Sequence, residues 1–561
     1  MKFKKWIFAV LILAATLIAS RDLLKPGYFS IHDDLQVGRL YEMDLCIKDG
    51  QFPCRWVPDM GYGYGYPLFN YYPPLPFYFG EIVHLMGFSF LDSTKAMFVA
   101  GFLISGILMF LFGRKLWGDF GGLLSSVLYI FAPYHSVDVY VRGAMNEHWA
   151  LAFLPGVCWA VYEIVDRKDR KFVPVMAIMF ALLLLSHNLM AFIFTPVIGI
   201  FGLLLIWLKK KDLKGKIVNL IIGGLFGVGL AAFFTLPVIL EKRFVHVETM
   251  LMGYFNYLAH FVSIGKLLFT RFWGYGSSGW LQETGMPFQV GVFHWILAVL
   301  VFICGNYLFW KKKLKKEIFF LFYFFFFIFL GSLFMVHPRS VQLWKNLPMI
   351  EYLQFPWRFL TLVIFSISVM GGGTVYLLKN KKAQILCSLL LVFLTISFNI
   401  EFFRVEKIFP MTDTEKLFSA KGWNKLQTDA IFDYLPIFAK APPGGPAPNR
   451  PEIKEGKAET HDVKKGTDWY QFKINVSEEA KIQIPVYDFP GWKVEIDGKK
   501  TTVFHDNFLG LITIVVSQGE HLISLNLRNT PVRFMANLIS VVSLCLLFYQ
   551  IFRKKNKISS K

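Results

Sequence analysis

Twelve apolar segments run through this chain, and most of them are close to twenty residues long. An α-helix needs about 20 consecutive apolar residues to cross the hydrocarbon core of a bilayer, and tilted or tightly packed helices can accommodate shorter segments. The sequence therefore predicts a polytopic α-helical membrane protein. The expected spans are residues 6–20, 93–113, 119–134, 148–165, 172–187, 190–208, 217–237, 288–310, 317–335, 355–378, 384–401 and 532–552.

Clusters of basic residues lie between many of these segments. Short basic loops stay in the cytoplasm, so we expect a multi-pass membrane protein with both termini in the cytoplasm. The same rule accounts for much of the formal net charge of +20, and we expect no nucleic-acid partner. The clusters are Lys2 to Lys5, Arg114 with Lys115, Arg167 to Lys171, Lys209 to Lys216, Lys311 to Lys316, Lys379 to Lys382 and Arg553 to Lys557.

Two segments allow a second interpretation. Residues 6–20 are expected to form an uncleaved first span, although a cleaved signal peptide is the alternative, because the apolar run is short and ends in Ala19 and Ser20. Residues 75–90 are apolar but short, and they contain Glu81 and His84. We expect an interfacial or re-entrant helix there, because a full span would invert every later loop.

The expected spans divide the chain into three parts. Residues 1–401 form a membrane module with large external loops at 21–92 and 238–287. Residues 402–531 form an external domain whose second half alternates apolar and polar residues, with turn signals such as Asp497-Gly498 between the runs. This pattern predicts an antiparallel β-sandwich. Residues 532–561 supply the last helix and a basic cytoplasmic tail.

Cysteine is sparse, with six residues in the whole chain. Cys46 and Cys54 both lie in the first external loop, where either a disulfide or two free thiols are expected. A bridge would close a small loop and stabilise the protein by about 2–3 kcal/mol. No CxxC or HExxH pattern occurs, so zinc is not expected.

The sequence His32-Asp33-Asp34 opens the first external loop. Carboxylates so close to a membrane are costly unless they are paired, bound to a metal or placed in a polar cavity. Asp33 and Asp34 are candidate catalytic residues, because a carboxylate can deprotonate an acceptor hydroxyl or bind Mg²⁺, Mn²⁺ or Ca²⁺. The alternative is a helix N-cap. His32 is a further candidate for the same cavity.

The next external loop contains Asp138, Tyr140, Arg142 and Glu147. Arg142 suits an anionic phosphate, because a guanidinium is planar, permanently charged and able to bind two oxygens. Glu147 and Asp138 could complete a metal site with Asp34. The alternative is that Arg142 pairs with Glu147 or Asp138. Tyr140 is a cavity candidate.

Three more polar residues lie at external positions. Arg358 opens a span in Gln354-Phe-Pro-Trp-Arg358, where it would bind a lipid-linked phosphate if it faces the bundle, or extend to headgroups if it does not. His187 interrupts an apolar run at an external turn, where a hydrogen-bonded loop histidine is the alternative. Arg55 follows Cys54, ahead of the aromatic run from Gly61 to Pro74. The rings of that run could hold sugars or isoprenoid chains, or lie at the membrane interface.

Five segments taken together resemble one known family: HDDLQVGRLYEM, GQFPCRWVPDMGYGYGYPLFNYYPPL, DVYVRGAMNEHWA, LLSHNL and QFPWRFL. They are similar to bacterial membrane proteins named "6-pyruvoyl-tetrahydropterin synthase-related", and the C-terminal region resembles YfhO-type proteins. Cys54 stands where a second proline is expected. The resemblance implies a GT-C-class membrane glycosyltransferase, with Asp33 and Asp34 matching the acidic position that this class has in its first external loop.

The expected activity is the transfer of a sugar from a polyprenyl-phosphate donor to a glycan, lipid or protein acceptor of the cell envelope, on the outer face of the membrane. The alternatives are a transporter or flippase of polyprenyl-linked sugars, and a non-catalytic scaffold for envelope assembly. The resemblance implies a divalent cation, Mg²⁺ or Mn²⁺, whereas no nucleotide cofactor is expected. Membrane lipid is the remaining expected partner.

Overall fold

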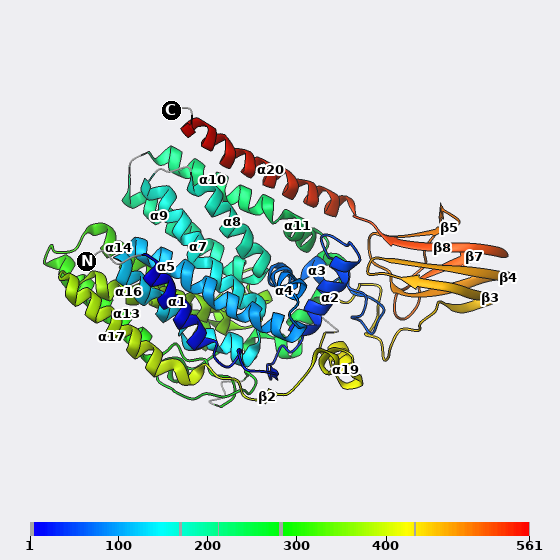
Figure 1. Ribbon diagram of the computed structural model, residues 1–561, viewed down its shortest axis with the longest axis horizontal. Helices are drawn as coiled ribbons and strands as arrows, with labels where there is room; N and C mark the ends of the chain where they lie inside the picture. Colours follow the sequence, from blue (N-terminus) through cyan, green and yellow to red (C-terminus); the bar gives the residue numbers. More distant parts are fainter. Residues whose placement is uncertain (1–4, 168–170, 211, 280–283, 431–433, 560–561) are drawn as a thin grey trace.

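The computed structural model describes the whole chain except residues 1–4, 168–170, 211, 280–283, 431–433 and 560–561. A helical bundle forms one side of the molecule, and most of the strands form a domain at the other side (Figure 1). Within the described residues, nine helices are long and apolar enough to cross a membrane, and Trp6–Ala19 and Phe172–Ser186 are shorter apolar helices. The polytopic helical class is confirmed. The basic residues Lys2, Lys4, Lys168, Arg170 and Lys211 lie outside the described residues.

Every expected span contains a helix, if α5 is counted as two helices on either side of its break at Gly118, where φ is 80°. One expected span, residues 217–237, is divided between α10 and α11, which meet at Ala231. The apolar helices are α1 (Lys5–Ala19), α5 (Phe90–Ile130), α7 (Met145–Arg167), α8 (Phe172–Ser186), α9 (Asn188–Leu208), α10 (Leu213–Leu230), α11 (Ala232–Leu240), α13 (Val292–Trp310), α14 (Lys316–Val336), α16 (Leu360–Tyr376), α17 (Lys381–Asn399) and α20 (Pro531–Ser559).

The centre of the bundle is formed by α5, α7 and α16, whose residues are mostly buried. Helix α16 lies very close to α5, because a Cβ added at Gly372 would be 2.1 Å from the Ser125 hydroxyl oxygen and 2.5 Å from the Gly121 carbonyl oxygen. Small residues at such crossings let helix backbones approach each other. Trp117 fixes the same contact by donating a hydrogen bond to the Val369 carbonyl at 2.7 Å.

Short elements lie between the long helices and ahead of the sheet domain along the chain. Residues 75–90, expected as an interfacial or re-entrant helix, contain the short helix α4 (Leu75–Leu85). The loop after α11 begins with 3-10 turns between Lys242 and Ala259. The remaining α-helices are α2 (Gln36–Lys48), α3 (Leu68–Tyr71), α6 (Pro133–Ser136), α12 (Ile264–Leu268), α15 (Val341–Asn346), α18 (Asp413–Leu417) and α19 (Ala420–Ala430).

The C-terminal domain is antiparallel, as predicted, but its strands form one connected sheet rather than two separate ones. Strand β4 is the reason, because it pairs with β8 through Val476 and with β7 from Ala480 onward. A two-stranded ribbon of β1 (Tyr28–Phe29) and β2 (Ile408–Phe409) lies outside this domain. The sheet contains β3 (Glu452–Lys465), β4 (Trp469–Tyr487), β5 (Trp492–Ile496), β6 (Lys499–Lys500), β7 (Leu511–Val516) and β8 (Gly519–Leu527).

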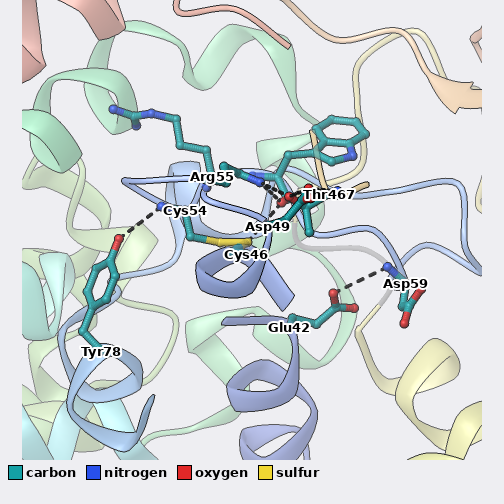
Figure 2. The surroundings of a disulfide bond; sticks show 10 residues. Glu42, Cys46, Asp49, Cys54, Arg55, Asp59, Tyr78 and Thr467 are labelled. Atoms are coloured by element: carbon teal, nitrogen blue, oxygen red, sulfur yellow. Dashed lines mark hydrogen bonds between the residues drawn. A yellow bond between two sulfur atoms is a disulfide. The ribbon is translucent and has the colours of Figure 1, made fainter. Parts of the chain in front are cut away.

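The loop of residues 21–92, which is expected to be external, joins the sheet domain to the bundle. Asp49 accepts hydrogen bonds from the backbone N–H and the hydroxyl of Thr467, at 2.6 and 2.8 Å (Figure 2). Trp56 packs edge-on against Trp492 with the ring centroids 5.6 Å apart. Cys46 and Cys54 form a disulfide beside these contacts, with Cα atoms 5.6 Å apart (Figure 2).

Replacing Cys46 and Cys54 together with serine is expected to lower the free energy of unfolding by about 2–3 kcal/mol, because the unfolded chain regains the entropy of the closed loop. Thermal unfolding of the purified protein in detergent, with and without reductant, measures this difference. Cys304→Ser is the matched control, since Cys304 is an exposed free thiol. An equal loss in the control variant would contradict the expectation.

The expected orientation predicts opposite accessibility for two surface positions. A cysteine at Lys312 is expected to react with a membrane-impermeant maleimide only from the cytoplasmic side, and a cysteine at Glu459 only from the outside. Glu459 is preferable to its neighbour Thr460, because the Thr460 side chain is buried in the sheet domain. Labelling of both positions from the same side would contradict the topology.

Candidate functional site

Asp33 lies where the first external loop meets the segment before α7. Its backbone N–H donates to the Arg142 carbonyl at 2.8 Å. Arg39, on α2, donates from Nη1 to both carboxylate oxygens at 2.9 and 3.1 Å, and Gln36 Nε2 donates at 2.9 Å. The Asp33 side chain nevertheless keeps 34% of its surface exposed. The structure therefore holds an accessible carboxylate in a fixed orientation.

Asp34 points to a different partner. Its carboxylate forms an ion pair with Lys416 on α18 at 2.7 Å, and only 16% of its side chain is exposed. Burial raises the pKa of Asp34, although the Lys416 ammonium opposes this effect. The N-cap alternative is not observed for either aspartate, because Leu35 occupies the N-cap of α2 and no side chain caps this helix. Asp34 thus connects the first loop to α18.

Arg142 lies at the end of a π-helix, η1 (Val137–Arg142), and is buried among acidic and aromatic side chains. Its guanidinium bonds Asp138 through Nη1 and Glu147 Oε2 through Nη2, the latter at 2.9 Å. It also stacks over the Trp357 ring with Cζ 4.3 Å from the centroid. Both ion pairs considered as alternatives to phosphate binding are therefore present.

Arg358 belongs to the 3-10 turn η8 (Pro356–Phe359) that precedes α16, and its side chain is buried rather than extended toward headgroups. Nη1 donates to the Leu353 carbonyl at 2.8 Å and to Gln354 Oε1 at 3.2 Å. Its Nε lies 3.5 Å from Glu147 Oε2. Glu147 therefore contacts both Arg142 and Arg358, and the contact with Arg358 is the longer one.

His187 lies next to these charges. It is the N-cap residue of α9, where its Nδ1 accepts from the Met190 N–H at 3.4 Å. Burial, together with the positive charges of Arg358 and Arg142, lowers the pKa of His187 to about 3. The imidazole is therefore neutral at physiological pH, and its hydrogen bond corresponds to the alternative of a hydrogen-bonded loop histidine.

The other cavity candidates have partners elsewhere. His32 Nε2 bonds the Tyr275 carbonyl at 2.7 Å, and the Tyr140 hydroxyl donates to the Ala19 carbonyl. Arg55 donates to Asn70, to the Phe233 carbonyl and to Asn537 at 2.8–3.2 Å, which ties the first loop to α11 and α20. These three side chains stabilise connections between elements, and the structure does not group them with Asp33.

The acidic residues expected to bind a metal do not fit a divalent cation. Asp34 pairs with Lys416, whereas Asp138 and Glu147 both pair with Arg142. In the part of the chain that the structure describes, no three His, Cys, Asp or Glu side chains lie together so that they could hold a metal ion. Asp34, Asp138 and Glu147 therefore belong to two separate ion-paired groups in this structure, and the binding of a divalent cation stays a prediction.

Several residues of this region were not expected from the sequence. Arg39 and Gln36 follow Asp33 on α2, and the Tyr72 hydroxyl accepts a hydrogen bond from Arg39 at 2.9 Å. Trp357 stacks on Arg142 from η8, the 3-10 turn that also contains Arg358. Arg39 and Gln36 are three residues apart and so share one helix face. This spacing is the sequence signal from which they could have been predicted as partners of Asp33.

The fold and this site define a class: a multi-span helical membrane protein in which buried arginine–carboxylate pairs adjoin an accessible aspartate. A protein-family comparison matches residues 69–405 to the "6-pyruvoyl-tetrahydropterin synthase related domain; membrane protein", which is more than half of the chain. The protein therefore belongs to this family. An uncharacterised protein of Lactococcus lactis subsp. cremoris (strain MG1363) is 25% identical over 296 residues, which cover 51% of this chain and 46% of the relative.

Solved structures similar to this chain include those of two named transferases and of ArnT. The oligosaccharyltransferase of Archaeoglobus fulgidus has a TM-score of 0.41 at 12% identity, covering 72% of this chain and 55% of that one. The mycobacterial arabinofuranosyltransferase AftD scores 0.46 at 10% identity, covering 72% and 27%. ArnT of Cupriavidus metallidurans, bound to undecaprenyl phosphate, scores 0.38 at 12% identity, covering 70% and 63%. At TM-scores below 0.5 these similarities carry no weight for the activity.

Proposed function

We propose that this protein is a GT-C-type glycosyltransferase that moves a sugar from a polyprenyl-phosphate donor to an acceptor of the cell envelope on the outer face of the membrane. One observation carries this proposal: the accessible carboxylate of Asp33 is joined through the backbone to Arg142, whose guanidinium is linked through Glu147 to Arg358. A base for the acceptor and two cations for the phosphate thus lie in one connected region.

The proposed reaction is a single displacement. The acceptor hydroxyl oxygen attacks the anomeric carbon of the sugar, and the bond from this carbon to the phosphate oxygen breaks. Asp33 takes the hydroxyl proton as general base, while the polyprenyl phosphate leaves with the bonding electron pair and the configuration inverts. The leaving phosphate gains negative charge, which a nearby guanidinium stabilises.

Arg358 is the arginine better placed to receive the phosphate. Its Nε is buried without a hydrogen bond, and its distance to Glu147 is 3.5 Å. Arg142 is held more closely by Glu147, at 2.9 Å, and also by Asp138. A phosphate oxygen can therefore bind Arg358 at a smaller loss of existing contacts, and Arg142 then fixes Glu147 beside it.

The test is sugar transfer by the purified protein in proteoliposomes. The donors are polyprenyl-phosphate hexoses with a radiolabelled sugar, and the acceptors are glycan, lipid and protein fractions of a cell envelope. Labelled acceptor is the expected product. Movement of intact donor across the bilayer without labelled acceptor would identify a transporter. If there is neither labelled acceptor nor donor movement, and the external domain alone restores envelope assembly, the protein would be identified as a scaffold.

Arg358→Lys is expected to weaken donor binding about tenfold, because an ammonium keeps the charge but loses the planar set of donors. Equilibrium binding of a polyprenyl-phosphate hexose to the detergent-solubilised variant measures the effect. Arg243→Lys is the matched control, since Arg243 is exposed. Unchanged donor affinity in both Arg358→Ala and Arg142→Ala would remove the arginines from the donor site.

A further inference from the structure

The sheet domain contains a cleft of about 510 Å³, which lies within the size range of ligand sites in proteins. Its lining comes from β3, β4, β7 and the loop before β7, together with Tyr64 of the first external loop. Tyr64 is held there by the Tyr487 N–H, which donates to its carbonyl at 3.3 Å, and by a ring contact with Tyr487 at 5.6 Å. The cleft therefore belongs jointly to the domain and to the loop that also contains Asp33.

A row of polar residues crosses the sheet in this cleft. Gln483 on β4 is the register partner of Glu452 on β3 and of Thr513 on β7. Directly paired residues on neighbouring strands project from the same face of a sheet. Gln483 is partly exposed, and no side-chain hydrogen bond joins it to any other residue that the structure describes. Its amide offers two donors and one acceptor oxygen to a ligand.

An exposed aromatic ring completes the cleft. Phe508 lines it with 62% of its surface exposed, whereas the aromatic residues Phe472, Tyr487 and Phe489 of the same domain are buried. A phenyl face attracts groups with partial positive charge, such as the C–H bonds of a sugar ring. An aromatic face beside a free amide provides both kinds of contact that a polyhydroxylated ring makes.

The charges of the lining exclude strongly ionic ligands. Lys454 pairs with Glu452 at 2.6 Å, and Lys481 lies 3.8 Å from Glu455. Asp506 is the remaining charged residue of the lining, so its formal charges balance: two basic and two acidic residues line the cleft. A polyanion or a polycation gains little from such a surface.

We propose that this cleft binds the saccharide units of a neutral glycan. Phe508 stacks on the apolar face of a sugar ring, Gln483 bonds its hydroxyls, and Glu452 and Asp506 accept hydrogen bonds at the rim. The site is separate from Asp33, and binding in it requires no donor and no turnover. Saccharide binding in this cleft can therefore be tested independently of the proposed transfer reaction.

The test is a titration of the full-length protein in detergent with chitotetraose, maltotetraose and mannotetraose by isothermal calorimetry, without donor. At least one tetrasaccharide is expected to bind with a Kd of about 1 mM or tighter. Phe508→Ala and Gln483→Ala are each expected to raise that Kd about tenfold. The matched controls are Phe504→Ala, at a ring that is 42% exposed but outside the lining, and Asn475→Ala, at an exposed amide on β4.

Three results would overturn the inference. The first is the absence of heat for all three tetrasaccharides up to about 10 mM. The second is an equal loss of affinity in Phe508→Ala and Phe504→Ala. The third is binding of a peptide of alternating lysine and glutamate, titrated in parallel, in place of the saccharides, which would assign the cleft to a zwitterionic peptide. Thermal unfolding of each variant shows whether the domain has remained folded.

Discussion

Asp33→Asn is expected to reduce the rate of sugar transfer at least about 10²-fold, because the amide keeps the size of the side chain but cannot accept the acceptor's proton. Arg39 and Gln36 now orient the carboxylate, and they are expected to hold the amide in place. Donor affinity and the unfolding temperature are therefore expected to stay near the parent values. Single-turnover measurement with preloaded donor separates the chemical step from binding.

Asp34→Asn is the matched control for this experiment. Asp34 pairs with Lys416 instead of lying at the accessible end of the loop, so its amide variant is expected to transfer sugar at a rate close to that of the parent. A large loss of stability in Asp34→Asn would show that the pair holds α18 in place. Normal transfer by Asp33→Asn would remove the proposed base from the mechanism.

Arg142→Gln is expected to destabilise the protein by about 3–5 kcal/mol, which is the usual result when one partner of a buried ion pair is removed. Asp138 and Glu147 would both lose the guanidinium that bonds them inside the bundle. The unfolding midpoint in a graded series of denaturing detergent, followed by tryptophan fluorescence, measures the effect. The loss is expected whether or not the protein transfers sugar.

Arg271→Gln provides the comparison for Arg142→Gln. Arg271 forms an ion pair with Glu401 at the surface, where both side chains are exposed, and exposed pairs contribute about 0–1 kcal/mol. A small effect of Arg271→Gln beside a large effect of Arg142→Gln is the expected pattern. Equal effects would mean that water reaches the Arg142 cluster and that the cluster is not a buried support for Arg358.

The membrane bundle was predictable because its signal is local: each span is a run of apolar residues, and hydropathy alone locates it. The strands were also predictable from alternation, since β4 and β8 each show period two. The single sheet was not, because β4 changes partners between Val476 and Ala480. That change of partner depends on pairing between segments far apart in the sequence, and the alternation of apolar and polar residues along one strand does not determine it.

The sequence predicted which residue types form the candidate site, but it predicted only some of the contacts that these residues make. Asp33, Asp34, Arg142 and Arg358 were expected to act together, and in the structure Asp33 contacts the Arg142 backbone while Glu147 contacts both arginines; their roles stay predictions. Asp34 was expected to bind a metal, but its partner is Lys416. Most of the membrane spans lie between these two residues in the sequence. Such a pairing leaves no local pattern in the sequence, so Lys416 could not be predicted as the partner of Asp34, and the divalent cation stays a prediction.

The contacts of the first external loop also set an order of events during synthesis. This loop is made early, but Thr467, Tyr487 and Asn537, which bind Asp49, Tyr64 and Arg55, belong to the last part of the chain. The loop can therefore reach its final contacts only after nearly the whole protein has been translated and inserted. A ribosome that stops before α20 would leave a membrane bundle whose first loop lacks its contact with that helix, and such a product would be an early target for quality-control proteases.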